Sequence, residues 1–221
     1  MGLSIEVGLV ADLLVNDEEG AEEIQQQFAE LSRYLTSIGL QPHVDPPDVE
    51  VWSGDMFGYS GLHYLRRLAA HLHYTQKLPE PGDDDSADDP VLQRYYNDYN
   101  DAPAGKAFGA YDHLIVHSDA EGYYLPQDFE CVIIPGDSCP VVDMVGSSQR
   151  LRAECEKIAA ALQLPLDLDP EDERLIEAAE SQGEGGGATA WERYGIESYS
   201  CLQLHRAACH SISTRAAIVF T

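Results

Sequence analysis

Three residues near the middle of the chain have the types and the spacing needed for acid–base or metal chemistry. His117, Asp119 and Glu121 occupy alternate positions, and next-but-one residues of an extended segment point to the same side. An imidazole and two carboxylates held together could transfer a proton or bind a divalent ion. They are the candidate catalytic group of a hydrolase. The competing interpretation is a turn in which the two acids bond to the backbone.

A second group, Cys201, His205 and Cys209, has residue types that bind zinc. On a helix each neighbouring pair is about 6 Å apart along the axis and the outer pair about 12 Å, so the three cannot share one ion. The five cysteines of the chain include no CxxC pair, which argues against both a zinc ribbon and a disulfide framework. We therefore expect reduced thiols, no metal and no cofactor.

Charge is the strongest global feature, because 39 acids face 13 bases and give a formal net charge of −26. Phosphates and anionic membranes repel such a chain, so direct binding to nucleic acid or to a membrane is disfavoured. Three explanations of the acidity remain open. It provides solubility or reflects a salt-adapted, lysine-poor proteome, it neutralises a basic partner protein, or it holds divalent cations.

An acidic insertion over residues 77–109 interrupts the periodic pattern with Pro, Gly, Asp and Ser. Its cap motif, Asp88-Asp89-Pro90, precedes tyrosines at helical spacing and predicts a short helix within a partly flexible segment. The tyrosines either pack onto the body or anchor a partner, since tyrosine is enriched among interface hot spots. The candidate partner-binding residues are Asp83, Asp84, Asp85, Asp88, Asp89, Tyr95, Tyr96 and Tyr99.

The central stretch, residues 112–162, organises the expected fold. Its β-branched runs at 114–116 and 131–134 are typical of buried strands, with a turn between them at 118–122. Leu151, Cys155, Ile158 and Leu162 then share one helical face behind Gly146-Ser147-Ser148, whose residue types predict an N-cap.

The remaining segments complete an α+β pattern. Hydrophobic periodicity predicts helices over 19–38, 62–72 and 190–211, with another beginning near Asp169, and strands within 4–15, 49–52 and 216–220. The strand at 49–52 is expected near an edge because of the prolines before it. We expect one domain over residues 1–221, with a mixed or antiparallel sheet covered by amphipathic helices. The helix over 19–38 should cover one face of that sheet.

High acidity and a compact α+β pattern resemble those of bacterial immunity proteins as a class. The resemblance implies a non-enzymatic binding protein that neutralises a basic partner such as a bacterial toxin. A hydrolase that uses His117, Asp119 and Glu121 is the first alternative, and an acidic scaffold domain is the second. The sequence has no signal peptide pattern and no apolar run of about 20 residues, so we expect a cytoplasmic protein.

Overall fold

Five short strands form one mixed sheet in the computed structural model, which describes residues 3–81, 86–118, 121–181 and 187–221. The sheet order is β2-β1-β5-β3-β4, with β3 and β4 parallel and the other neighbours antiparallel. The strands are β1 (Ser4–Val7), β2 (Trp52–Asp55), β3 (Tyr123–Leu125), β4 (Val145–Ser147) and β5 (Ile218–Phe220).

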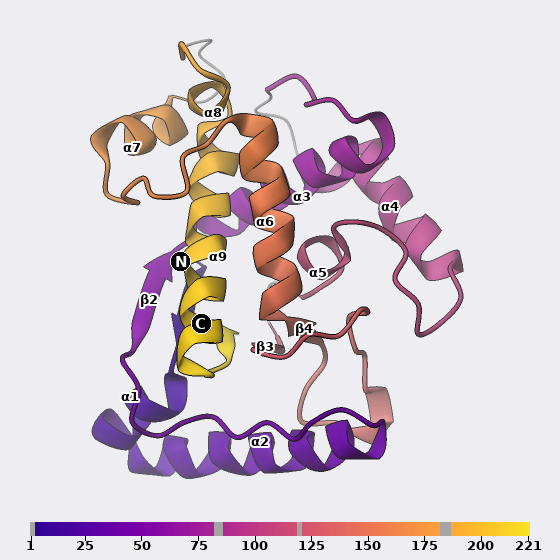
Figure 1. Ribbon diagram of the computed structural model, residues 1–221, viewed down its shortest axis with the longest axis vertical. Coiled ribbons are helices and arrows are strands. Elements are labelled where there is room, and N and C mark those ends of the chain that lie inside the picture. Colours follow the sequence, from indigo (N-terminus) through magenta and orange to yellow (C-terminus); the bar gives the residue numbers. More distant parts are fainter. Residues whose placement is uncertain (1–2, 82–85, 119–120, 182–186) are drawn as a thin grey trace.

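Nine α-helices in the described residues complete the fold and confirm the predicted α+β class. Figure 1 shows α6 and α9 side by side along the long axis, with α2 lying across one end of the molecule. The helices are α1 (Leu9–Asn16), α2 (Glu18–Ser37), α3 (Gly58–Thr75), α4 (Pro90–Asp101), α5 (Asp112–Ile115), α6 (Ser148–Leu162), α7 (Glu173–Glu180), α8 (Ala190–Arg193) and α9 (Gly195–Thr214).

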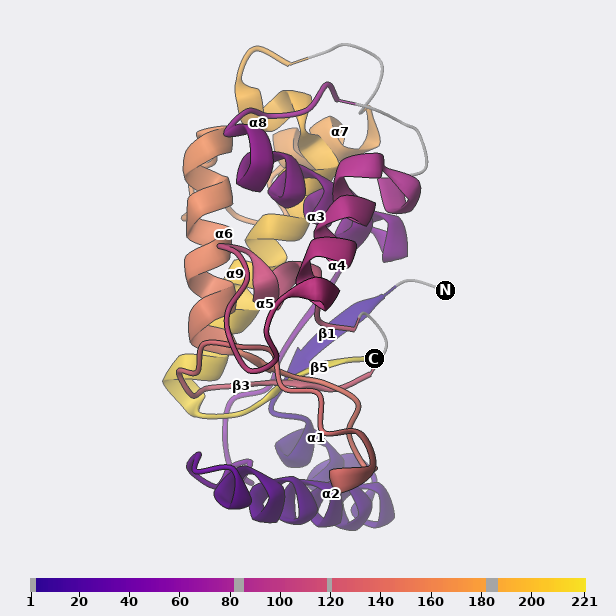
Figure 2. The same cartoon turned by 90° about the vertical axis from the view of Figure 1, so that its right-hand side faces the viewer.

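The sheet separates two apolar clusters. Successive side chains at β5 and just before it point alternately into one cluster and the other. Ile218 and Phe220 belong to the larger cluster with side chains of α3, α6 and α9, whereas Ala217 belongs to the cluster beneath α2. In Figure 2 the sheet accordingly lies between α2 and the other large helices. The prediction that the helix over 19–38 covers one face is confirmed. The assignment of residues 1–221 to one domain stays a prediction.

Local signals account for both ends of α2. Asp17 is its N-cap, and the carboxylate accepts a hydrogen bond from the Gly20 amide at 3.1 Å. Gly39 follows the helix with a φ of 84°, which favours glycine. Along the helix Phe28, Leu31 and Leu35 are buried at helical spacing. The same kind of signal was correct for α6, where Ser147 is the N-cap.

Several predicted strands differ from the structure. Residues 114–116 lie in or next to the short helix α5, and residues 131–134 contribute a single bridge, from Ile133 to Val145. The segment 4–15 divides at Gly8, with β1 before it and α1 after it. The strand predicted at 49–52 begins at Trp52, although it does lie at the edge of the sheet.

The helix predicted over 190–211 is interrupted at Tyr194, so that α8 and α9 are separate. Gly195, the first residue of α9, is where α7 approaches most closely. A Cβ atom at this position would overlap the backbone of Ala178. The helix start therefore requires glycine for packing.

Hydrogen bonds from distant elements explain why residues 112–115 are helical. The Glu154 carboxylate of α6 accepts from the amides of His113 (3.2 Å) and Leu114 (2.7 Å), which are orphan donors at the start of α5. At the other end, Arg66 of α3 donates to the carbonyl oxygens of Leu114 (3.0 Å) and His117. These contacts satisfy buried backbone groups that a strand would have to pair within a sheet.

Burial leaves this region with few charges. It raises the pKa of Glu154 to about 8, although the amides of Leu114 and His113 oppose the shift. It also lowers the pKa of both His113 and His117 to about 4. Between pH 6.5 and 8 the folded protein therefore holds a proton on Glu154 that the unfolded chain has lost, because the ordinary carboxyl pKa is 4.5.

This linkage predicts a loss of stability with rising pH. In the wild type, Glu154 should lower the free energy of unfolding by up to about 1.4 kcal/mol per pH unit between pH 6.5 and 8. Glu154→Gln should be less stable at every pH but should lack this contribution to the slope. Urea unfolding across that range measures it, with the exposed neighbour Glu156→Gln as the control that keeps the wild-type slope. Equal slopes in the wild type and Glu154→Gln would contradict the assignment.

No helix in the described part of the chain is long and apolar enough to cross a membrane. The cytoplasmic location stays a prediction.

Candidate functional site

The histidine of the predicted catalytic turn lies in the core. His117 is 1% exposed and its ring stacks on Tyr124, with centroids 4.0 Å apart. Its Nδ1 is 2.8 Å from the Ser118 carbonyl oxygen and its Nε2 is 3.2 Å from that of Tyr123. Burial keeps the ring neutral at physiological pH, with a pKa of about 4. A ring enclosed in this way is poorly placed to take a proton from a substrate.

The carboxylates of that turn do not share the environment of the histidine. Glu121 is exposed, and a hydrogen bond with Asp143 together with the negative charge of Asp143 raises its pKa. Asp119 lies outside the described residues. His117 thus has its partners in the core, whereas Glu121 has its partner at the surface. This arrangement gives the hydrolase hypothesis no support.

The cysteine and histidine residues on α9 also have separate contacts. Cys201 is buried, and its thiol donates to the Cys155 carbonyl oxygen of α6 at 3.4 Å. Cys209 Sγ lies 3.7 Å from His205 Nε2. Across residues 3–81, 86–118, 121–181 and 187–221, no three His, Cys, Asp or Glu side chains form a group that could hold a metal ion. All five thiols are free.

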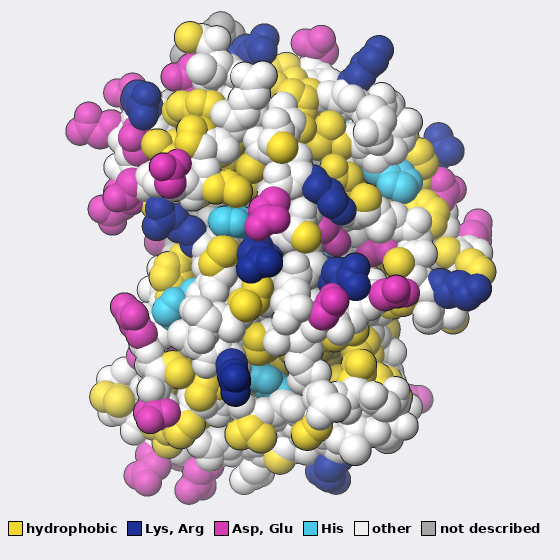
Figure 3. Space-filling view, in the orientation of Figure 1, with side chains coloured by type: hydrophobic (Ala, Val, Ile, Leu, Met, Phe, Trp, Pro, Cys, Tyr) yellow, Lys and Arg dark blue, Asp and Glu magenta, His cyan; other side chains and the backbone are white. Residues whose placement is uncertain are grey.

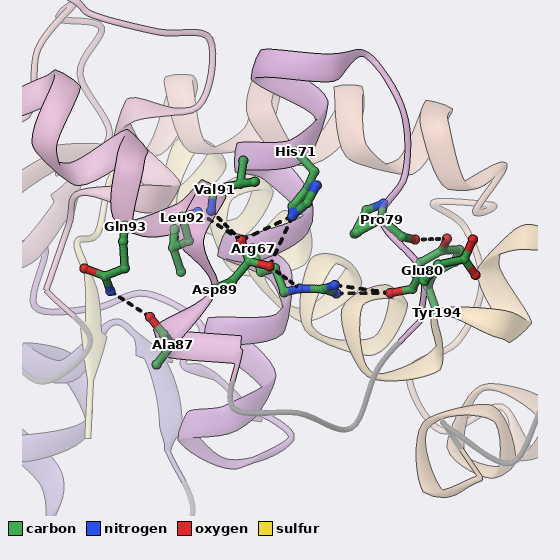
Figure 4. A network of polar contacts seen from close by, with 10 residues as sticks. All are labelled: Arg67, His71, Pro79, Glu80, Ala87, Asp89, Val91, Leu92, Gln93 and Tyr194. Atoms are coloured by element: carbon green, nitrogen blue, oxygen red, sulfur yellow. Dashed lines mark hydrogen bonds and ion pairs between the residues drawn. The ribbon is translucent and has the colours of Figure 1, made fainter.

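Asp89, a predicted partner-binding residue, is engaged within the fold (Figure 4). Its Oδ1 caps α4 by accepting from the amides of Val91 (2.8 Å) and Leu92 (3.1 Å), and its Oδ2 accepts from Arg67 Nε at 2.9 Å. His71 Nε2 is 3.2 Å from both oxygens. Burial would raise the pKa of Asp89, but these hydrogen bonds outweigh it and lower the pKa. The carboxylate therefore joins α3 to α4.

Two further contacts in Figure 4 attach the segment before α4 to the body of the protein. Arg67 also donates to the Glu80 carbonyl oxygen at 3.3 Å, and the Tyr194 hydroxyl donates to that of Pro79 at 2.5 Å. The predicted flexibility of the insertion therefore does not extend to residues 79–80. Asp83, Asp84 and Asp85 lie outside the described residues, and Asp88 is exposed.

The tyrosines of α4 differ in accessibility. Tyr95 is 0% exposed and its hydroxyl donates to Asp112 at 2.7 Å, so it offers no surface to a partner. Tyr95 packs onto the body of the protein. Tyr96 and Tyr99 are half-buried, and Tyr99 lines a cleft of about 390 Å³ with Tyr34. A role of Tyr96 and Tyr99 in partner binding stays a prediction.

A larger acidic surface lies on another side of the molecule. Figure 1 places α7, β2 and α1 along its left margin. In Figure 2, where the right-hand side of Figure 1 faces the viewer, α7 and α1 lie at the back. Asp and Glu side chains project along this margin in Figure 3. We call this surface the acidic edge and define it by residues 12–23, 48–55 and 167–180. These residues include sixteen of the 39 acids and one of the 13 bases, Arg174.

The densest part of the acidic edge is the start of α2. Its acids are exposed, and the first base of the chain, Arg33, comes three turns later. Sequence reasoning missed this surface because a polar helix face usually indicates only solvation. The signal was the absence of any lysine or arginine before residue 33. We call this group the α2 ridge, and it consists of Asp17, Glu18, Glu19, Glu22 and Glu23.

An extended acidic surface on a folded α+β body is typical of an acidic binding protein. The comparison with protein families is more specific, because the model of the family described as "Putative DNA-mimic protein" matches residues 1–220. The chain belongs to this family of DNA mimics. Comparisons with curated proteins and with solved structures gave no match.

The contacts of Asp89 predict that it is needed for stability. Asp89→Ala removes the cap of α4 and leaves Arg67 without its carboxylate, so we expect a loss of about 2 kcal/mol in the free energy of unfolding. The adjacent Asp88→Ala removes the same charge from an exposed position and should change stability by about 0.5 kcal/mol or less. Urea unfolding of the two variants tests this difference, and equal stabilities would contradict it.

Proposed function

We propose that this protein binds a basic DNA-binding protein through its acidic edge and thereby occupies the surface that would otherwise bind DNA. Membership of the DNA-mimic family supports the class of partner. The distribution of charge supports the surface, because the acidic edge concentrates acids where almost no base offsets them.

The charge spacing of the α2 ridge is the observation that carries the proposal. Its five carboxylates occupy positions 17 to 23, a span of about 9 Å at a rise of about 1.5 Å per residue. Five charges enclose four intervals, so the ridge carries one negative charge per roughly 2.3 Å. Duplex DNA carries one per about 1.7 Å of helix axis. A surface selected to bind DNA therefore meets a similar line of charge on the α2 ridge.

The N-terminus of α2 offsets part of the repulsion among the five acids of the α2 ridge. Acids in the first turn interact favourably with the positive end of the helix dipole, by about 0.3–1 kcal/mol each. The i,i+4 pairs Glu18–Glu22 and Glu19–Glu23 repel one another by only a few tenths of a kcal/mol in an exposed helix. The buried face of α2 then fixes the ridge on the sheet. A basic partner would relieve the remaining repulsion, which favours association.

A narrower version of the proposal is an immunity-type inhibitor that neutralises a toxin. The acidic edge would serve this role if the toxin presents a basic, DNA-binding face. The acidic insertion is the competing surface for either role, and Asp88 is exposed among its described acids.

Two variants that remove equal charge decide between the surfaces. The ridge variant changes Glu18, Glu19, Glu22 and Glu23 to Gln, and the insertion variant changes Asp83, Asp84, Asp85 and Asp88 to Asn. Partners are captured on the immobilised wild type from nuclease-treated extract and identified. We expect DNA-binding proteins that added duplex DNA releases. The ridge variant should bind them about tenfold more weakly or worse, with a flatter salt dependence.

The insertion variant should bind within about twofold of the wild type if the acidic edge is the interface. The reverse ranking would assign the interface to the insertion. Retained proteins that duplex DNA does not release would overturn the DNA-mimic proposal for this chain.

A further inference from the structure

A groove of about 470 Å³ lies between α2 and the segment over residues 43–47 that runs beside it. Its apolar lining comes from Val10 of α1, from Phe28 and Ala29 of α2, and from Val44 and Pro47. Val44 is 80% exposed, so an apolar rim faces solvent. The groove has the size of a site for a side chain or a small ligand.

The groove continues from the α2 ridge. Glu18, Glu22, Gln25 and Ala29 follow one another at spacings of four, three and four residues, so they share one face of α2. Gln25 and Ala29 line the groove, and the two glutamates lie on the adjoining turns towards the start of the helix. Negative charge therefore borders the apolar walls, which favours a cationic occupant.

A buried carboxylate also lines the groove. Asp45 is 6% exposed, and its Oδ1 accepts from the Ala217 amide at 2.6 Å and lies 3.2 Å from His43 Nε2. Phe28 packs edge-on against His43, with ring centroids 5.2 Å apart. The groove thus combines aliphatic and aromatic walls with an acid, which suits a long side chain that ends in a cation.

We propose that this groove binds one arginine side chain of the basic partner, with its methylene stem against Ala29, Val44 and Pro47 and its guanidinium at Asp45. The inference rests on the proposed function for the identity of the partner. Arginine fits better than lysine because its guanidinium is planar and more weakly hydrated than an ammonium group, so it loses less hydration in a partly enclosed groove. The groove would add selectivity for side-chain shape to the general attraction of the α2 ridge.

Peptides provide a test that does not require the natural partner. Two short lysine-rich peptides differ at one central residue, which is arginine in the first and citrulline in the second. Citrulline has nearly the same shape as arginine but no charge. A third has leucine there. Binding to the full-length protein is measured by titration calorimetry or fluorescence anisotropy at several salt concentrations. We expect the arginine peptide to bind about tenfold more tightly than either of the others.

Variants of the groove identify where this preference arises. Asp45→Asn retains an oxygen for the Ala217 amide and should reduce the arginine-to-citrulline ratio to about threefold or less. Asp137→Asn removes the same charge from an exposed position outside the acidic edge and should leave the ratio within about twofold of the wild type. Ala29→Trp should fill the groove and abolish the preference, whereas Gln26→Trp, at another exposed position of α2, should not.

Thermal unfolding establishes whether each variant is folded. If Asp45→Asn is unfolded, the test depends on Ala29→Trp. An unchanged ratio in folded Ala29→Trp would overturn the inference, as would equal effects of Asp45→Asn and Asp137→Asn. A leucine peptide that binds as tightly as the arginine peptide would overturn it in favour of an apolar occupant. Failure of the DNA-mimic proposal is recognised separately, because it appears as captured proteins that duplex DNA does not release.

Discussion

Repulsion among 39 acids with 13 bases to offset them is the constraint on which the structure depends. Many bases are placed where an acid must be held in one position. Arg67 bonds to Asp89 between α3 and α4, Arg150 bonds to Asp128, and Arg174 bonds to Asp172 at the start of α7. Because these bases are committed to individual acids, the α2 ridge is left with its charge uncompensated. The acids of the acidic edge therefore share a negative field, which under the proposed function would attract a surface made for DNA.

Three ionisable side chains in the interior are uncharged near neutral pH. Glu154 lies beneath α5 with a pKa of about 8, so it is mostly protonated at neutral pH. His113 and His117 are neutral there because burial lowers their pKa values to about 4. A neutral buried acid still satisfies two backbone amides, and a neutral histidine still bonds through its ring nitrogens. Polar groups thus order the core around α5 while the unbalanced charge stays at the surface.

The proposed binding surface combines a line of charge with a shaped groove. The α2 ridge provides long-range attraction, which mainly speeds association, and the groove at Asp45 would provide a short-range contact, which mainly slows dissociation. Both are built on α2, whose buried residues Phe28, Leu31 and Leu35 fix the helix on the sheet. A rigid helix keeps its carboxylates in place before the partner arrives, so less conformational entropy is lost on binding.

The sequence by itself determined the acidity, the α+β class and the elements with strong local signals. Asp17 and Gly39 mark the ends of α2, Asp89-Pro90 marks the start of α4, and Ser147 marks that of α6, because capping and turn preferences depend on a few adjacent residues. Only the tertiary structure decided that residues 112–115 are helical, since their backbone partners are Glu154 and Arg66, from helices distant in sequence. It also decided which acids are used internally, as at Asp89, and which remain on the acidic edge. The sequence counts charges, whereas the distance between two charges, and hence the field they share, is defined only once the chain has folded.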